Sequence, residues 1–290
     1  MKNIKIFMLF LIASLFLISC TKEEIKNPIN NINETEGLLL VKSFESNDIK
    51  AEVFNDSGTL SVGFNKIFIR LTDKQGNYIK QSSISLLPMM TMNMHGNTHQ
   101  HSCPVSGITK VEGKETLYEG YIVFIMPSGD SENFWELTFT CNLDGQTYKV
   151  SDKINVLPSE TEFSKKFSSA TGSDGKKYFL ALVEPAQPKI GVNDIVVALF
   201  QRDDSGNFPI VDNYKMMVDP RMPGMGNHSL PGNKDLEQLS DGLYHGKVGF
   251  SMSGYWKINL MLENEAGEVI KGEQVTLQNQ ESSLNFKLEF

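Results

Sequence analysis

The sequence predicts an all-β protein: two tandem immunoglobulin-like β-sandwich domains that follow a signal peptide and a flexible tether. Three observations predict this class, namely an internal repeat, short runs of alternating apolar residues broken by Gly, Asn, Asp and Pro, and no long run with a 3.6-residue period. We expect the tether at residues 20–36, the first sandwich at 37–158 and the second at 177–290. Each sandwich is long enough to bury its own core.

The first residues, 1–19, have the features of a secretory signal peptide. A positively charged start precedes an apolar run that is shorter than the roughly 20 residues a membrane span needs. The sequence Leu17-Ile18-Ser19-Cys20 resembles the lipobox of bacterial lipoproteins, which implies that Cys20 is lipidated. Lys22-Glu23-Glu24 resembles the export signal of some Bacteroidetes lipoproteins. We therefore expect an outer-membrane lipoprotein of the cell envelope, facing either the periplasm or the exterior and held to the membrane only by its lipid.

Composition excludes several classes of protein. A net charge of −8 with no basic block argues against nucleic-acid binding, which needs clustered Lys and Arg. The sequence also lacks a Gly-x-Ser-x-Gly nucleophile motif, a His-Glu-x-x-His motif and a phosphate-binding glycine loop, so we expect no enzyme. Apart from Cys20, only Cys103 and Cys141 remain. In an oxidising envelope this pair forms a disulfide by default, and the alternative is that Cys103 is a thiolate ligand.

The repeat relates two stretches of the chain through landmarks in the same order. Gly63–Leu71 matches Gly191–Leu199, Leu117–Gly120 matches Leu243–Gly246, and Phe134–Leu137 matches Tyr255–Ile258. Methionine recurs at Met126 and Met252, ahead of each tryptophan, where we expect it to pack against the indole. On the strands that follow, alternate residues starting at Trp135 and Trp256 are expected to face the core. Asp241-Gly242-Leu243-Tyr244 resembles the tyrosine corner of Greek-key sandwiches.

Methionine and histidine gather in two windows at matching places in the repeat. Eight of the eleven methionines beyond the signal peptide lie in 89–103 and 216–228, as do four of the five histidines. Thioether sulfur is a soft, neutral ligand that favours Cu(I), whereas imidazole accepts both Cu(I) and Cu(II). The windows therefore predict copper sites, with Cu(I) favoured and Cu(II) also accepted. The alternative is that the methionines bind no metal and instead fill gaps in the core or form contact surfaces.

Candidate ligands follow from the spacing within each window. If the first window is extended, Met90, Met92 and Met94 project to one side and Met89 to the other. The candidate set in the first window is Met90, Met92, Met94, His95, His99, His101 and Cys103, and in the second copy it is Met217, Met222, Met225, His228 and His245. We expect Met222, Met225 and His228 to share a turn, with His245 approaching from a strand end, and Met89 and Met216 are equally compatible with the core.

The second copy resembles a known family of envelope domains. Met222-Pro223-Gly224-Met225-Gly226-Asn227, Gly242-Leu243-Tyr244 and Phe250–Trp256 together resemble YtkA-like and FixH-like domains, and the first copy resembles them more loosely. This resemblance implies small β-sandwiches linked to copper handling or to assembly of copper-containing oxidases. FixH proteins commonly span the membrane, whereas nothing after residue 20 here has the length and apolarity to do so.

We therefore expect a copper-binding envelope lipoprotein that sequesters copper or delivers it, exchanging the ion with a donor or acceptor protein. The alternative is a cell-surface adhesion or ligand-binding sandwich lipoprotein that binds no metal and uses its methionines as contact surface.

Overall fold

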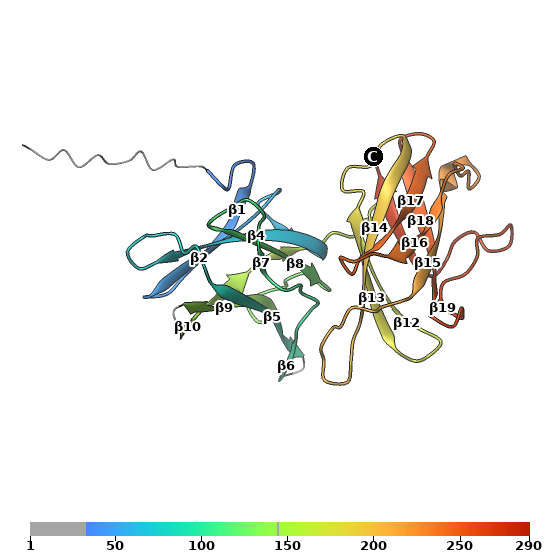
Figure 1. Cartoon of the computed structure of the whole chain (residues 1–290). Helices are drawn as coiled ribbons and strands as arrows, with labels where there is room; N and C mark the ends of the chain where they lie inside the picture. Colours follow the sequence, from blue (N-terminus) through green and yellow to red (C-terminus); the bar gives the residue numbers. More distant parts are fainter. Residues whose placement is uncertain (1–32, 95, 144) are drawn as a thin grey trace, which may run out of the picture. The chain divides into compact units, whose positions relative to one another are not determined.

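The computed structural model describes residues 33–94, 96–143 and 145–290. The expected lipidation site Cys20 and the signal peptide lie outside the described residues. Within them the regular structure is β-strand, apart from a single 3-10 turn, η1, at Pro223–Met225 (Figure 1). The prediction of an all-β, sandwich-type fold is confirmed.

The N-terminal sandwich consists of two main antiparallel sheets. One has the order β1 (Leu39–Glu45), β2 (Ile49–Asn55), β4 (Gly63–Asp73), β8 (Leu117–Phe124) and β7 (Thr109–Lys110). The other has the order β10 (Gln146–Ile154), β9 (Phe134–Leu143), β5 (Ser83–Met94) and β6 (Asn97–His101). A short parallel pair, β3 (Leu60–Ser61) with β11 (Val156–Leu157), accompanies them. Alternate residues of these strands, including Ile67, Trp135 and Phe139, form one buried core.

The C-terminal sandwich is built from one nine-stranded sheet that closes most of the way around its core. Its order is β12 (Phe167–Thr171), β13 (Lys177–Glu184), β14 (Gly191–Gln201), β17 (Tyr244–Phe250), β16 (Lys234–Gln238), β15 (Lys215–Arg221), β18 (Tyr255–Glu263) and β19 (Val269–Lys271), with β20 (Asn285–Glu289) also paired to β18. Ile195 of β14, Tyr244 of β17 and Trp256 of β18 meet in the same buried cluster. Strands far apart in the sheet order therefore share one core.

The sequence repeat appears as repeated hydrogen-bond geometry. At the start of β4, Asn65 Nδ2 donates to the backbone carbonyls two and four residues earlier, at 2.8 and 2.7 Å. At the start of β14, Asn193 Nδ2 donates to the equivalent carbonyls at 3.0 and 2.7 Å. Gly63 and Gly191 precede them with φ of 100° and 105°, a conformation that favours glycine. The two copies thus begin a long central strand with the same device.

The tyrosine corner is also present. The Tyr244 hydroxyl donates to the carbonyl of Val211 at 2.7 Å and accepts the backbone N–H of Tyr214 at 3.2 Å. The ring is fully buried, so both bonds are shielded from water. They fix the start of β17 against the segment that leads into β15.

Replacing Tyr244 by Phe should therefore lower the free energy of unfolding by about 1–3 kcal/mol, because a buried carbonyl and a buried N–H lose their partner. Urea denaturation of the mature chain, followed by circular dichroism, measures this. Tyr78→Phe is the control: Tyr78 is 47% exposed, and its change should stay within about 0.5 kcal/mol. Equal effects of the two changes would contradict a stabilising role for the corner.

Candidate metal centre

The first Met/His window forms an antiparallel hairpin of β5 and β6. Met90 pairs with His101, Met92 with His99, and Met94 with Asn97. Alternate residues of a strand point to the same face, and directly opposed residues share it. The three methionines therefore lie on one face with both histidines, as the spacing predicts. The candidate ligand His95 lies outside the described residues.

The other face of this hairpin is polar and uncharged. It carries Thr91, Asn93, Thr98 and Gln100, and Gln100 Nε2 donates to Thr91 Oγ1 at 3.1 Å. No Asp, Glu, Lys or Arg occurs anywhere in residues 89–103. The Met and His side chains of the paired residues thus share one face, on which Asn97 lies opposite Met94, while hydroxyl and amide groups occupy the other face.

At the base of the hairpin, His101 contacts a methionine from another segment. His101 Nε2 lies 3.3 Å from Met126 Sδ, and His101 Nδ1 lies 2.9 Å from the carbonyl oxygen of Ser102. A carbonyl only accepts, so Nδ1 carries the proton of this bond, and in the neutral ring Nε2 presents its lone pair towards the sulfur. Metal-bound histidines are held in this way, with the other ring nitrogen donating to a carbonyl or carboxylate.

The spacing of the two donor atoms suits a shared ion. A tetrahedral ion with bonds of about 2.0 Å to imidazole nitrogen and about 2.3 Å to sulfur holds the two donors about 3.5 Å apart. The observed 3.3 Å between His101 Nε2 and Met126 Sδ differs little from this. Met90 is the partner of His101 across the ladder and lies on the same face, so it is the nearest candidate for a third donor. We call Met90, His101 and Met126 the inner site.

Trp135 lies against the inner site. Its indole is fully buried, and its ring centroid lies 5.5 Å from that of His101 in an edge-to-face contact. Trp135 Nε1 donates to the backbone carbonyl of Met126 at 3.0 Å. This bond anchors the backbone from which the Met126 side chain reaches the histidine. Sequence reasoning assigned Met126 to packing against the tryptophan, and its contact with His101 was missed, although the recurrence of Met126 and Met252 was a signal for it.

The C-terminal sandwich repeats part of this arrangement, namely the Met–His pairing and the tryptophan hydrogen bond. Met222 and His228 form an antiparallel bridge in which Met222 N–H donates to the carbonyl of His228 at 2.9 Å. The β15–β18 register, continued one residue past Arg221 and Lys257, sets Met222 opposite Trp256. Trp256 Nε1 donates to the carbonyl of Met252 at 3.0 Å. The residues Met222, His228, Met252 and Trp256 thus correspond to Met90, His101, Met126 and Trp135.

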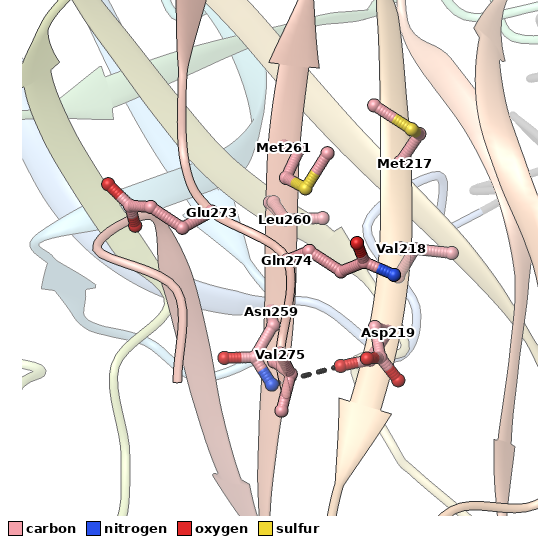
Figure 2. Close-up of a pocket in the computed structure, with 9 residues that line it drawn as sticks. All are labelled: Met217, Val218, Asp219, Asn259, Leu260, Met261, Glu273, Gln274 and Val275. Carbon is pink, nitrogen blue, oxygen red and sulfur yellow. Dashed lines mark hydrogen bonds between the residues drawn. The ribbon is translucent and has the colours of Figure 1, made fainter. Parts of the chain in front are cut away.

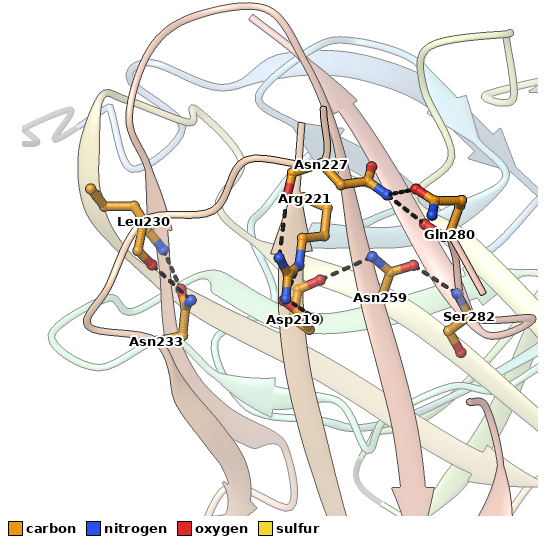
Figure 3. A network of polar contacts seen from close by, with 9 residues as sticks. Asp219, Arg221, Asn227, Leu230, Asn233, Asn259, Gln280 and Ser282 are labelled. Carbon is orange, nitrogen blue, oxygen red and sulfur yellow. Dashed lines mark hydrogen bonds and ion pairs between the residues drawn. The ribbon is translucent and has the colours of Figure 1, made fainter. Parts of the chain in front are cut away.

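The turn between Met222 and His228 is short, and Arg221 and Gln280 form hydrogen bonds to it. Gly226 and Asn227 adopt positive φ values of 64° and 58°, which closes the turn after η1. Arg221 Nη1 donates to the carbonyl of Asn227 at 3.2 Å, and Asn227 Nδ2 donates to Gln280 Oε1 at 2.5 Å (Figure 3). Met225 lies on this turn with 56% of its side chain exposed. Met222 is buried in the core while His228 is exposed, so this second site is more open than the inner site.

Two predicted ligands of the second copy, Met217 and His245, do not join this turn. Met217 points to the sheet face opposite Met216 and Met222, because it is offset from them by an odd number of residues. It pairs instead with Met261, and both line a cavity of about 290 Å³ on the outer side of the sheet (Figure 2). Met216 is fully buried in the core.

His245 is also separated from the turn, contrary to the expectation that a strand end brings it close. It lies near the start of β17, where its Nε2 is 2.9 Å from Asp241 Oδ2. Met222 lies beside Gly254, in the connection that follows the other end of β17. His245 and Phe250 at that end are five residue steps apart along the strand, about 17 Å. His245 is therefore paired with Asp241 and lies far from the turn.

Cys103 and Cys141 are both free and buried, so the structure contains no disulfide between them. Burial raises the pKa of the Cys103 thiol well above its usual value, and that of Cys141 to about 11. Both are neutral thiols at pH 7, whereas the thiolate is the form that binds metal. Within the described residues, no three His, Cys, Asp or Glu side chains form a group that could hold a metal ion. Any site there depends on the thioethers.

Comparison with known proteins identifies part of the chain. Residues 173–261 match the family model described as YtkA-like, a range that contains Met222, His228 and Trp256. No curated protein matches the chain. A solved structure, the adhesin InvE of Yersinia pseudotuberculosis, is similar at 12% identity with a TM-score of 0.26. The similarity covers 86% of this chain and 60% of the adhesin, so the chain spans about three fifths of that protein's length.

The described part of the chain has no helix that is long and apolar enough to cross a membrane. YtkA-like domains are associated with the cell envelope. In the C-terminal sandwich, residues 173–261 are thus similar to this family of envelope domains.

Proposed function

We propose that this chain is a copper-binding protein of the cell envelope that sequesters Cu(I) or delivers it to a partner protein. One observation carries the proposal. His101 Nε2 and Met126 Sδ lie 3.3 Å apart, and the other nitrogen of the same imidazole is bonded to the Ser102 carbonyl. A histidine and a thioether are thus already arranged as two ligands of one ion.

The donor set selects the ion by its softness. Two thioethers and one imidazole carry no charge, so they offer little to Mg²⁺, Ca²⁺ or other hard cations that need oxygen ligands. Cu(I) accepts both sulfur and nitrogen, and Cu(II) would retain mainly the imidazole. We propose a carrier rather than an enzyme, because exchangeable neutral ligands are suited to passing an ion on. Lipidation at Cys20 would hold the carrier at the outer membrane.

The two tryptophans offer a test, because each lies at one of the two sites and the chain has no others. In the Trp256→Phe variant, Trp135 is the sole indole, and its ring lies 5.5 Å from His101. Titration of the mature protein with Cu(I), or with the redox-inert soft ion Ag(I), should quench Trp135 emission and saturate at one ion for the N-terminal sandwich. Competition with a Cu(I) chelator then gives the affinity.

Two controls accompany the titration. His101→Asn should abolish the quenching while circular dichroism stays unchanged, and Mg²⁺ should leave the emission unaltered. Failure of the unaltered protein to retain Cu(I) or Ag(I) against the chelator would overturn the proposal. That result would favour the metal-free ligand-binding alternative.

A further inference from the structure

The donor atoms on the β5–β6 hairpin extend well beyond the inner site. We propose that Met92, Met94 and His99 form a separate outer station for Cu(I), through which the ion enters and leaves the inner site. This inference rests on the proposed copper binding and adds a route to it. The route runs along one face of the hairpin, from its exposed end to its base.

A gradient of exposure defines this route. Met90 is 1% exposed and belongs to the core, Met92 is half-buried at the edge of that core, and Met94 is 50% exposed. His99 is exposed opposite Met92, whereas His101 is half-buried opposite Met90. Each step outward along the strand therefore offers a donor that solvent reaches more easily.

The step length matches what a methionine can span. Successive residues on one face of a strand lie about 7 Å apart, twice the rise per residue. Methionine has three rotatable bonds and no branch, so its sulfur can swing towards either neighbour on the same face. An ion held by Met92 and His99 can thus gain a bond to Met90 before it loses the bond to Met94.

Packing does not account for the outer methionines. β6 pairs only with β5 among the described strands, so it forms the edge of its sheet, and residues 97–100 are all exposed. A methionine that fills a gap in a core is covered by its neighbours. Met94 is not, and Met92 only in part.

The opposite face argues that the donors are placed selectively. If methionines were scattered for general apolarity, both faces of the β5–β6 ladder would carry them. Thr91, Asn93, Thr98 and Gln100 occupy its other face, and Met89 lies before the part of β5 that pairs with β6. Residues 89–103 contain no Asp or Glu, so the hairpin itself supplies no carboxylate that would compete with the soft donors. A soft monovalent cation is the ligand class that fits.

The transfer is a ligand exchange without redox chemistry. Each step forms one Cu–S or Cu–N bond and breaks another, so the ion remains Cu(I) and no proton needs to move. On release, the last bond to break is the one to Met94 or His99. The ion then passes to a thioether, imidazole or chelator donor of another molecule.

Transfer kinetics test the outer station. In the Trp256→Phe background, Cu(I) is supplied as its complex with a colorimetric chelator, and Trp135 quenching is followed by stopped flow. The triple change Met92→Leu, Met94→Leu and His99→Asn should slow loading and chelator-driven removal alike, by about tenfold. The equilibrium affinity of the inner site should change little. Met89→Leu is the matched control, since Met89 lies on the same strand but faces the other way.

The outcomes are distinguishable. Unchanged rates with intact binding in the triple variant would overturn the outer station and leave the proposed function in place. An equal loss of rate in Met89→Leu, or a loss of affinity as large as the loss of rate, would also overturn it. Failure of the unaltered protein to bind Cu(I) at all would instead overturn the proposed function. Circular dichroism of each variant verifies folding, which Met-to-Leu changes are expected to preserve.

Discussion

Replacing Met90 and Met126 together by Leu is expected to remove Cu(I) from the N-terminal sandwich without unfolding it. The change deletes both sulfur donors of the inner site and leaves His101 as a single ligand. Changes to groups that merely orient a ligand cost about 10–100-fold in metal affinity, so losing two ligands should cost more than about 100-fold. Leu and Met have similar volumes, and the expected cost in stability stays below about 1.5 kcal/mol. Chelator competition and thermal unfolding measure the two effects.

Met216→Leu provides the matched control for this change. Met216 is as deeply buried as Met90, but it lies in the core of the other sandwich. It should lose neither copper nor appreciable stability. If the double variant binds Cu(I) as tightly as the unaltered protein does, the inner site is assigned to the wrong residues.

Trp256→Ala should produce the largest loss of stability among single changes. The indole is fully buried, packs on Phe250 at 5.1 Å between ring centroids and donates to the Met252 carbonyl at 3.0 Å. Truncating a buried tryptophan leaves a cavity and costs about 3–5 kcal/mol. The carbonyl of Met252 loses its partner as well. Urea denaturation, read by circular dichroism, should therefore show a markedly lower midpoint.

Trp256→Phe separates the contribution of ring packing from that of the indole hydrogen bond. Phenylalanine keeps much of the buried ring but cannot donate to Met252, so its cost should fall well below that of alanine. A loss as large as that of Trp256→Ala would mean that the indole N–H, rather than the packing, dominates. A loss below about 1 kcal/mol for Trp256→Ala would contradict the placement of this residue at the centre of the core.

The sequence predicts the fold because the relevant signals are local. Apolar alternation around Trp135 and Trp256 needs only the two-residue period of a strand, and the tyrosine corner at Tyr244 follows from a short motif. Local sequence does not predict that the nine-stranded C-terminal sheet curls around to close most of the way on itself. This closure depends on contacts between strands such as β14 and β18 that are far apart in sequence, which no local pattern encodes.

The candidate site divides in the same way. The stripe of Met90, Met92 and Met94 is a property of one strand, and the structure reproduces it. Met126 reaches His101 from a segment 25 residues away, so only tertiary structure brings the pair together. The expectation that a strand end brings His245 close to the turn was wrong for a related reason. His245 lies near the start of β17 beside Asp241, whereas Met222 lies beside Gly254 after the other end of that strand, and only the tertiary structure decides which end approaches the turn.

The β5–β6 pairing restricts how this hairpin can change length during evolution. Ten residues separate Met90 from His101, whereas five separate Met222 from His228, although each Met/His pair forms an antiparallel pairing that closes a loop. Deleting one residue after Met90 would turn Met92 and Met94 to the side that carries Thr91 and Asn93, because strand faces alternate with a period of two. Losing two residues from each strand would instead shorten the row of donors by one pair and keep the rest aligned. Insertions or deletions of an even number of residues in each strand should therefore be tolerated, whereas those of an odd number should not.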